Sequence, residues 1–422
     1  VAIGELADSL AIDLDAVPVK YEGLDGTELA ISESQERMAV VLSPQDKKKF
    51  IQLSEEENLE AVKVAEVTDS GRLEMFWKGK AIVDISRDFL DSNGIKQKTK
   101  VYVKSPSEKA NYFQSNQKDY NSKSLKDLWI KNLQDLNVAS QKGLVERFDS
   151  SGGAYTVLSP FGGEYQDTPA EGLLMKLPVL KGNTNASIAM TYGYNPYLSK
   201  WSPFHGGLYA VLHAVSKIVA LGGDYRKIRL TMQEYFEKLG TDEEKWGKPF
   251  AALLGAYRAQ KGFNIPAIGG KDSMSGTFMD MDVPPTLVAF AVAIMDVKNA
   301  ISQEFKNKDS KVVLVPIKKD ENHLPDFDYM KKAYDKIHKL IRSKSVLSAS
   351  TVKEGGAAAA LTKMCFGNRI GLDIYEDIGL EELFREDFGS IILELDKSTN
   401  IAEALSEIDY LSLGVTSSRP II

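Results

Sequence analysis

The stretch Gly269-Gly270-Lys271-Asp272-Ser273-Met274-Ser275-Gly276-Thr277-Phe278 is a polar, glycine-rich loop between two apolar segments. It follows a helix-like segment from Pro249 to Lys261 and a short apolar run over 263–268. It precedes 286–295, which is apolar throughout and rich enough in β-branched residues to predict a buried strand. We therefore expect a strand to lead into one tight turn that carries two glycines, a lysine, a carboxylate and two hydroxyls.

This combination of residues suits the binding of an anion. Glycine lets the backbone approach an anion closely and point N–H groups at it, and lysine supplies a compensating charge. The alternative is an ordinary polar turn between strands. Because such a turn does not need two hydroxyls beside a Lys-Asp pair, Asp272, Ser273 and Ser275 favour a binding site over a plain turn.

Two motifs resemble one enzyme family. The loop, with Ser202-Pro203-Phe204-His205-Gly206-Gly207 upstream, resembles the second half of phosphoribosylformylglycinamidine (FGAM) synthase of purine biosynthesis, in its large, glutamine-dependent form. The segment Ile31-Ser32-Glu33-Ser34-Gln35-Glu36-Arg37-Met38 is similar to one in the first half of that family. The resemblance covers nearly all 422 residues. It implies an ATP-dependent C–N ligase that uses ATP and Mg²⁺ to convert formylglycinamide ribonucleotide and glutamine to formylglycinamidine ribonucleotide.

Composition narrows the class of protein. The net charge of −7 and the absence of a long basic run argue against a nucleic-acid partner. No apolar stretch approaches the roughly 18 residues of a membrane-spanning helix. The lone Cys365 excludes an internal disulfide framework and favours a reducing, cytoplasmic location. The chain begins at Val1 and enters an amphipathic stretch at once, which we interpret as the mark of an internal fragment.

The order of the segments predicts an α+β fold with mixed α/β layers. The resemblance implies AIR-synthase-like (PurM-like) N-terminal and C-terminal domains in a tandem pseudo-repeat. We expect a truncated C-terminal-type domain of the first half over 1–103, a linker and helix over 104–147, an N-terminal-type domain of the second half over 148–304, and its C-terminal-type domain, truncated at its end, over 305–422.

Three local expectations can be compared directly with a structure. Residues 37–42, which are apolar after Arg37, predict a buried strand. Residues 61–67 and 72–77 predict a hairpin around the turn Asp69-Ser70-Gly71, with a second turn at Lys78-Gly79-Lys80. Residues 124–142 carry leucines and Trp129 at helical spacing and predict one amphipathic helix.

The resemblance assigns candidate roles to residues in both motifs. Glu33, Ser34, Gln35 and Ser273 resemble residues that hold the substrate. Gly269, Gly270 and Lys271 resemble a nucleotide contact, and the candidates for catalysis are His205, Lys271 and Asp272. His205 precedes a helix, where a neutral imidazole can meet a phosphate or a carbonyl; the alternative is a turn histidine whose nitrogens bond to the backbone. The sequence identifies no metal ligand, and no His/Cys cluster has the spacing of a zinc site.

The chain also departs from the family. Many large members hold an auxiliary, non-catalytic ADP–magnesium site, built from an aspartate, a Glu-x-x-x-Asn on the long helix and an aspartate before Gly-Gly. The corresponding segments here read Lys181-Gly182-Asn183-Thr184, then His213 and Lys217, then Ser350-Thr351-Val352-Lys353-Glu354-Gly355-Gly356. The acidic ligands are largely missing, which puts that site in doubt. A glutaminase is missing too, because Cys365 has neither a Gly-flanked elbow nor a partner histidine.

Two other functions are considered. One is a catalytically empty scaffold whose glycines serve only turns. The other is a different phosphate-activating member of the superfamily, such as a thiamine-phosphate or selenophosphate-type kinase, against which the segment around Glu33 argues. For the favoured function we expect the first half and the glutaminase domain of the same enzyme as partners. We also expect the chain alone to be inactive and to form a homodimer through exposed apolar surface.

Overall fold

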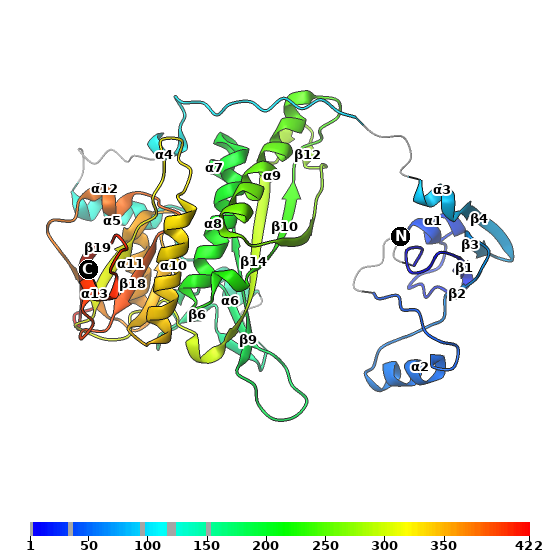
Figure 1. Ribbon diagram of the computed structural model, residues 1–422, viewed down its shortest axis with the longest axis horizontal. Helices are drawn as coiled ribbons and strands as arrows, with labels where there is room; N and C mark the ends of the chain where they lie inside the picture. Colours follow the sequence, from blue (N-terminus) through cyan, green and yellow to red (C-terminus); the bar gives the residue numbers. More distant parts are fainter. Residues whose placement is uncertain (1–2, 33–36, 93–97, 116–123, 149–152) are drawn as a thin grey trace. The chain divides into compact units, whose positions relative to one another are not determined.

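The computed structural model describes residues 3–32, 37–92, 98–115, 124–148 and 153–422 (Figure 1). The chain divides into two compact units, Val1–Lys98 and Thr99–Ile422. Each unit has its own β-sheet and its own hydrophobic core, so each is described by itself. None of the helices in these ranges is both long and apolar enough to cross a membrane.

The first unit is a small four-stranded sheet with short helices. Its strands are β1 (Leu10–Asp13), β2 (Ala65–Val67), β3 (Arg72–Trp77) and β4 (Lys80–Ser86), in the order β2-β1-β3-β4. Its helices are α1 (Gly26–Ile31), α2 (Lys47–Glu56) and α3 (Arg87–Asp91). Leu10, Ile12 and Leu14 form the core. The predicted turn at Lys78-Gly79 is confirmed, since Lys78 and Gly79 both have positive φ and join β3 to β4.

Two predictions for this unit are wrong. The expected hairpin of 61–67 with 72–77 does not form, because β1 lies between β2 and β3 and pairs with both. The strand expected over 37–42 is also absent, and Met38 is 92% exposed. An apolar run becomes a strand only where a neighbouring strand accepts its hydrogen bonds, and the described residues provide none here.

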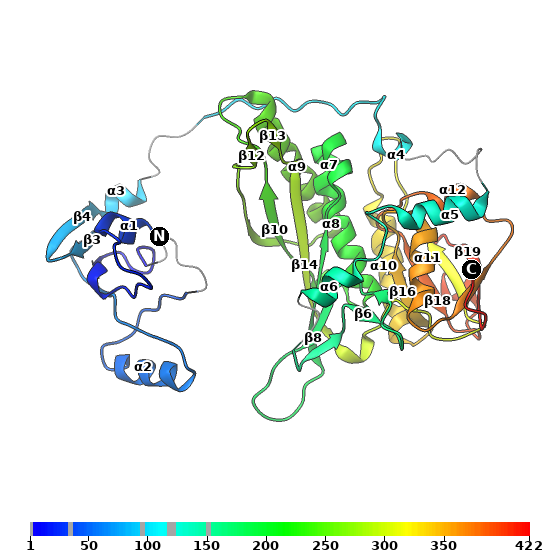
Figure 2. The ribbon, with the colours of Figure 1, turned by 180° about the vertical axis from the view of Figure 1, so that it is seen from behind.

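The second unit contains a six-stranded sheet in the order β11-β10-β14-β9-β8-β5. The strands are β5 (Thr156–Leu158), β8 (Leu173–Lys176), β9 (Ala186–Gly193), β10 (Arg229–Tyr235), β11 (Ala267–Lys271) and β14 (Thr286–Asp296). The strand predicted over 286–295 is confirmed as β14, but only alternate residues of it are buried. Helix α8 (Pro203–Ala220) packs on β9 and β14, and α7 (Pro196–Trp201) and α9 (Glu243–Phe263) pack on α8 (Figures 1 and 2).

Helix α8 is the centre of this unit. Ser202 caps its first turn by accepting a hydrogen bond from the backbone N–H of His205, and Pro203 occupies the first helical position, where its missing N–H costs nothing. Every residue from His205 to Ala220 is buried. A helix that is buried on all sides needs neighbours on all sides. The sheet, α9 and a strand of the next sheet, β16 (Val346–Thr351), supply them.

A five-stranded sheet follows, in the order β16-β18-β15-β19-β17. Its other strands are β15 (Lys311–Val315), β17 (Gly371–Ile374), β18 (Ile391–Leu395) and β19 (Leu411–Ser417). Helix α10 (Phe327–Arg342) shares a core with one face of the sheet and with α8. Helices α11 (Gly356–Phe366) and α12 (Leu380–Phe384) share a second core with the other face. The α+β fold with mixed layers is confirmed.

The segment before the six-stranded sheet holds three short helices, α4 (Tyr112–Ser115), α5 (Leu125–Gln134) and α6 (Lys142–Arg147). The single helix predicted over 124–142 is therefore wrong. Asp135 ends α5, because its carboxylate accepts the backbone N–H of Asn137 and so competes with continued helix. Trp129 of α5 donates its indole N–H to Thr362 of α11 at 2.9 Å. The domain boundaries predicted at 103, 147 and 304 remain predictions.

The remaining elements are short, and most lie in loops. They are β6 (Phe161–Gly162) paired with β7 (Thr168–Pro169), β12 (Thr277–Phe278) paired with β13 (Met281–Asp282), and α13 (Ile401–Ala404), together with three single turns of 3-10 helix over Leu14–Ala16, Tyr225–Lys227 and Val297–Asn299. The β12–β13 pair extends the loop that the sequence identified as a candidate site.

Candidate functional site

The candidate loop begins inside a strand. Gly269, Gly270 and Lys271 belong to β11, which pairs in parallel with β10 at the edge of the six-stranded sheet. Ile268 is an extra residue in that pairing, and the bulge restores the register at Gly269. The expectation that the glycines lie in a tight turn is therefore wrong. The neighbouring strand β10 accepts this segment as a sixth strand, which local sequence does not reveal.

Gly270 has a structural reason to be glycine. A Cβ atom there would overlap the carbonyl oxygen of Met232 in β10, so no other residue allows the two strands to approach this closely. Gly269 differs, since a Cβ atom at that position would meet nothing within 4 Å. The scaffold alternative thus accounts for both glycines, for Gly270 by packing and for Gly269 by a positive φ of +154° that favours glycine.

Beyond Lys271 the loop is tied to the end of β10. Ser273 donates its backbone N–H to the carbonyl of Glu234 at 3.1 Å and accepts the N–H of Phe236 at 2.9 Å. The hydroxyls of Ser273 and Ser275 lie 2.8 Å apart. The loop therefore has a defined conformation in which both hydroxyls sit on the same short segment.

The side chains of Lys271 and Asp272 face solvent. Neither has an ion pair with any residue that the structure describes. The scaffold alternative predicts that Lys271 and Asp272 pair with each other or with other surface residues. The described residues show no such pairing. An exposed, unpaired ammonium beside strand-edge glycines leaves this position open to a negatively charged ligand.

Sequence reasoning missed Glu234. It lies on the inner face of β10 with Leu230 and Met232, is only 6% exposed, and its Oε1 has no hydrogen-bond partner among the described residues. Burial, and then the nearby carboxylate of Asp272, raises the pKa of Glu234 to about 7. The sequence of β10 contained a signal for this burial. Its inward residues alternate with outward ones, and Glu234 follows Leu230 and Met232 as the third inward residue.

A second glutamate close by shows what a satisfied carboxylate looks like here. Glu237 is 4% exposed, and its Oε1 accepts a hydrogen bond from the ammonium of Lys248 at 2.8 Å. Glu234 has no such cation. A buried, unpartnered carboxyl group beside a second carboxylate is typical of sites that handle protons or bind ligands.

His205 lies in the first turn of α8, away from bulk solvent. Its Nδ1 is 2.8 Å from the hydroxyl of Ser202, and its Nε2 is 3.0 Å from the carbonyl of Asn322. Burial lowers the pKa of His205, so the ring is neutral near pH 7. The turn-histidine alternative expected backbone partners, and only Nε2 has one. The expectation that His205 precedes the helix is wrong, because α8 begins at Pro203. The catalytic role of His205 remains a prediction. Glu33, Ser34 and Gln35 lie outside the described residues.

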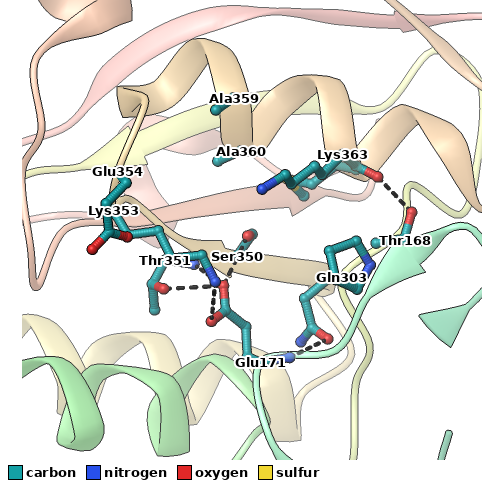
Figure 3. Close-up of a pocket in the computed structure, with 12 residues that line it drawn as sticks. Thr168, Glu171, Gln303, Ser350, Thr351, Lys353, Glu354, Ala359, Ala360 and Lys363 are labelled. Carbon is teal, nitrogen blue, oxygen red and sulfur yellow. Dashed lines mark hydrogen bonds and ion pairs between the residues drawn. The ribbon is translucent and has the colours of Figure 1, made fainter. Parts of the chain in front are cut away.

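A second cluster of charges is buried where the auxiliary nucleotide site was expected (Figure 3). At its centre Glu171, in the segment between β7 and β8, points toward the end of β16. One carboxylate oxygen accepts the hydroxyl of Ser350 at 3.1 Å, and both the N–H of Thr351, at 2.9 Å, and its hydroxyl, at 3.0 Å. The other oxygen lies 3.5 Å from the ammonium of Lys353.

Three lysines surround this carboxylate. Lys217 of α8 is buried, and its ammonium donates to the carbonyl of Tyr192 at 3.0 Å. Lys363 of α11 lines the same cavity as Lys353 (Figure 3). Burial, and then repulsion from Lys353, lowers the pKa of Lys217 and of Lys363 to about 8. Burial would raise the pKa of Glu171, but the charges of Lys353 and Lys217, together with the hydrogen bonds from Thr351, keep the pKa below its ordinary value.

Other sequence predictions about chemistry can be compared with these positions. His213, one turn before Lys217, is packed inside α8 against Phe388, and its Nε2 has no partner among the described residues. Cys365 is buried, and burial raises the pKa of its thiol to about 12, which suits a packed residue and not a nucleophile. The described residues contain no group of three or more His, Cys, Asp or Glu side chains placed to hold a metal ion.

Sequence comparison connects the chain to known proteins. Residues 1–78 match the family described as AIR synthase related protein, C-terminal domain. The phosphoribosylformylglycinamidine synthase subunit PurL of Thermoplasma volcanium is 27% identical over 97% of this chain. The same subunit of Staphylococcus carnosus is 25% identical over 92% of it. The chain is a relative of the PurL subunit of phosphoribosylformylglycinamidine synthase.

The PurL-related chain spans about half the length of the relatives it matches, with 56% of the Thermoplasma protein and 52% of the Staphylococcus protein covered. Solved structures agree on the fold. The structure of Thermotoga maritima PurL complexed with ATP superimposes with a TM-score of 0.66 and 18% sequence identity. The match covers 97% of this chain and 59% of the Thermotoga chain. The complex of that protein with FGAR gives a TM-score of 0.65 and 19% identity. At this identity the likeness establishes the PurM-like α+β fold.

Proposed function

We propose that this chain is part of the synthase region of an ATP-dependent ligase that converts formylglycinamide ribonucleotide, glutamine and ATP to formylglycinamidine ribonucleotide. The observation that supports this most is the match to PurL subunits along 97% of the chain. The exposed loop adds a local reason, since Lys271 has no ion pair among the described residues and lies at a strand edge that is followed by two hydroxyls. In the same proposal, the parent enzyme is the large, glutamine-dependent form.

In this proposal the loop binds the nucleotide. Gly269, Gly270 and Lys271 would contact the phosphates of ATP, with the Lys271 ammonium offsetting their charge. Because phosphate oxygens and water usually supply most ligands of Mg²⁺, the ion would enter with the nucleotide, and we assign it no protein ligand. Ser273, with its hydroxyl beside that of Ser275, would hold the formylglycinamide ribonucleotide together with Glu33, Ser34 and Gln35.

Glu234 and Asp272 would handle protons in this site. Replacing an amide oxygen by ammonia requires protons to leave the nitrogen nucleophile. A carboxyl group with a pKa of about 7 is half ionised at neutral pH and can accept one of them. Asp272, exposed next to it, would keep that pKa high by charge repulsion. His205 remains a candidate that would polarise a carbonyl as a neutral imidazole.

The scaffold alternative and the synthase proposal predict different effects of the same variant. In the complete enzyme, the double substitution Lys271→Ala and Ser273→Ala should abolish most ADP formation that depends on formylglycinamide ribonucleotide and ammonia. Full activity of that variant would rule out a catalytic role for the loop and leave the scaffold. The 422-residue chain alone should release no ADP with these substrates, because it spans about half of its relatives. Steady turnover by the chain alone would contradict this.

Partners and location complete the proposal. Alternate residues of β8, β9 and β14 point away from α8 and form the outer face of the six-stranded sheet. Many of these residues are apolar. They include Leu173, Met190, Tyr192, Phe290 and Ile294, and the last is 60% exposed. We propose that a second copy of the chain covers this face in solution, as the sequence led us to expect. In the parent enzyme, the first half and the glutaminase domain would be the partners of this chain. The parent enzyme would act in the cytoplasm.

A further inference from the structure

We propose that Glu171, Lys217 and Lys353 form a permanent, metal-independent charge cluster in the place where the family resemblance implies an auxiliary ADP–magnesium site. The inference concerns the donor groups of this chain and does not depend on its ligase activity. Two of the three segments that correspond to that site do meet in the structure, since Lys217 of α8 and the residues before Gly355-Gly356 both act on Glu171. The third, Lys181-Gly182-Asn183-Thr184, lies in the loop between β8 and β9 and does not line the cavity.

The carboxylate at the centre has one oxygen saturated by protein donors and one that faces a lysine. A carboxylate offers about four lone-pair positions. Three protein donors, from Ser350 and Thr351, occupy one oxygen of Glu171, and Lys353 lies beside the other. The other nearby carboxylate is partly committed too, because Glu354 accepts the side-chain amide of Asn195 at 3.0 Å. A divalent cation would have to displace these donors.

Charge disfavours the metal as well. Lys217 and Lys353 carry the sign of the metal they would face, and Lys363 adds a third ammonium on the same cavity. Lysine donates hydrogen bonds and has no lone pair to offer when protonated, so it cannot act as a ligand. It can, however, neutralise a buried carboxylate, which is what a bound Mg²⁺ would otherwise do. The lysines therefore take over the electrostatic role and leave no role for the ion.

Space leads to the same conclusion. The cavity between these side chains has a volume of about 10 Å³, which is roughly what one water molecule requires. One amide of its wall, Nε2 of Gln303, is buried without a partner among the described residues, and a water molecule there would satisfy it. A nucleotide does not fit without rearranging the wall. The cluster thus joins the β7–β8 segment directly to β16 and the turn after it, and Lys217 of α8 adds its charge.

The first experiment is denaturation of the 422-residue chain and of Lys353→Met. Removing Lys353 takes away the only ion pair that Glu171 makes among the described residues, so the folding equilibrium constant should fall by about 100-fold or more. The loss should be equal in EDTA and in Mg²⁺ with ADP. The double variant Glu171→Gln, Lys353→Met should recover part of it, because the buried carboxylate is then gone while Lys217 keeps its hydrogen bond to the carbonyl of Tyr192. Lys318→Met is the matched control, since Lys318 is paired with Asp409 at the surface and should change the constant only a few-fold.

If Lys353→Met does not fold, Lys353→Arg keeps the charge and should retain the stability of the parent chain. The second experiment uses the parent chain and follows its melting temperature in EDTA, in Mg²⁺, and in Mg²⁺ with ADP. We expect Mg²⁺ alone to cause no shift. Any stabilisation by Mg²⁺ and ADP should persist in Lys363→Ala and disappear in Lys271→Ala, which places it at the loop. A shift that disappears in Lys363→Ala and persists in Lys271→Ala would overturn the inference, as would an unaltered stability of Lys353→Met.

Discussion

The ammonium nitrogen of Lys353 lies 3.5 Å from a carboxylate oxygen of Glu171, a side chain that is only 2% exposed. Burial would lower the pKa of Lys353, but Glu171 and then Glu354 raise it above its ordinary value, so the lysine is charged at any physiological pH. The two residues lie 182 positions apart in the sequence. Their contact fixes the segment before β8 against the end of β16, and it makes the interior of the second unit sensitive to charge.

Lys217 should make stability depend on alkaline pH. Burial and then Lys353 hold its pKa at about 8, against an ordinary 10.5, while Glu171 and Glu354 oppose the shift and the neutral His213 lies one turn away. Below pH 8 both the folded and the unfolded chain carry the proton. Between pH 8 and 10 the folded chain releases it first, so the free energy of unfolding should rise by roughly 2 to 3 kcal/mol.

Urea denaturation at several pH values, compared with Lys217→Met, measures this contribution. Methionine does not titrate, so the difference between the two proteins should grow from pH 8 to pH 10. Tyrosines titrate in both proteins and cancel in that difference. A difference that stays constant over this range would show that Lys217 is not held in a costly charged state.

Glu234→Gln should stabilise the chain at neutral and alkaline pH. The pKa of Glu234 is about 7 in the folded state and 4.5 ordinarily, so its contribution is fully present below pH 4.5 and is lost as the pH rises through 7. Glutamine removes the buried charge and should raise the free energy of unfolding by up to about 3 kcal/mol at pH 8, with no gain at pH 4.

Thermal melts of Glu234→Gln and Glu237→Gln at both pH values provide the comparison. Glu237 is equally buried but bonds to Lys248, so its replacement should destabilise the chain at pH 8. In the complete enzyme Glu234→Gln should lower turnover despite its stability, a trade-off that is common at functional sites. Destabilisation by Glu234→Gln at pH 8 would mean that Glu234 has a partner that stabilises its charge.

Lys271→Ala should change function and not stability. The side chain is exposed and has no ion pair among the described residues, so the free energy of unfolding should stay within about 0.5 kcal/mol. If its ammonium contacts phosphate, the affinity of the complete enzyme for ATP should fall roughly 10- to 100-fold. Lys238→Ala, another exposed lysine at the end of β10, is the control and should leave ATP affinity unchanged.

The apolar sheet face should cause self-association. Ile294→Asp places a charge in the middle of that face and should weaken the dimer at least about 10-fold, as measured by sedimentation over a range of concentrations. Phe250→Asp alters an exposed aromatic residue on α9, in the helical layer, and should leave the dimer intact. A parent chain that remains a monomer at high concentration would contradict the proposal.

Much of the fold could be predicted wherever one segment alone contains the signal. The apolar run over 286–295 is a local pattern, and the structure has the strand β14 there. The burial of Cys365 followed from the apolar helix around it. The family resemblance depended on two short motifs, and sequence comparison confirmed it.

Pairing between distant segments could not be read from those patterns. The hairpin expected around Asp69 fails because β1 lies between its two strands. Residues 37–42 form no strand because none of the described strands accepts their hydrogen bonds. Gly269 and Gly270 lie in a strand because β10 offers an open edge. Each case depends on which hydrogen-bonding groups the rest of the chain brings nearby, and hydrogen bonds between strands are not local.

The sequence by itself determined the composition of the candidate sites: a Gly-Gly-Lys-Asp-Ser loop, a helix with histidine and lysine in place of acidic ligands, and a lysine before Gly355-Gly356. Only the tertiary structure decided that Glu234 is buried beside Asp272 without a partner, and that Glu171 meets Lys353 and Lys217. The physical reason is that the energy of a charge depends on the solvent and the partners around it, and in a folded chain distant residues supply both.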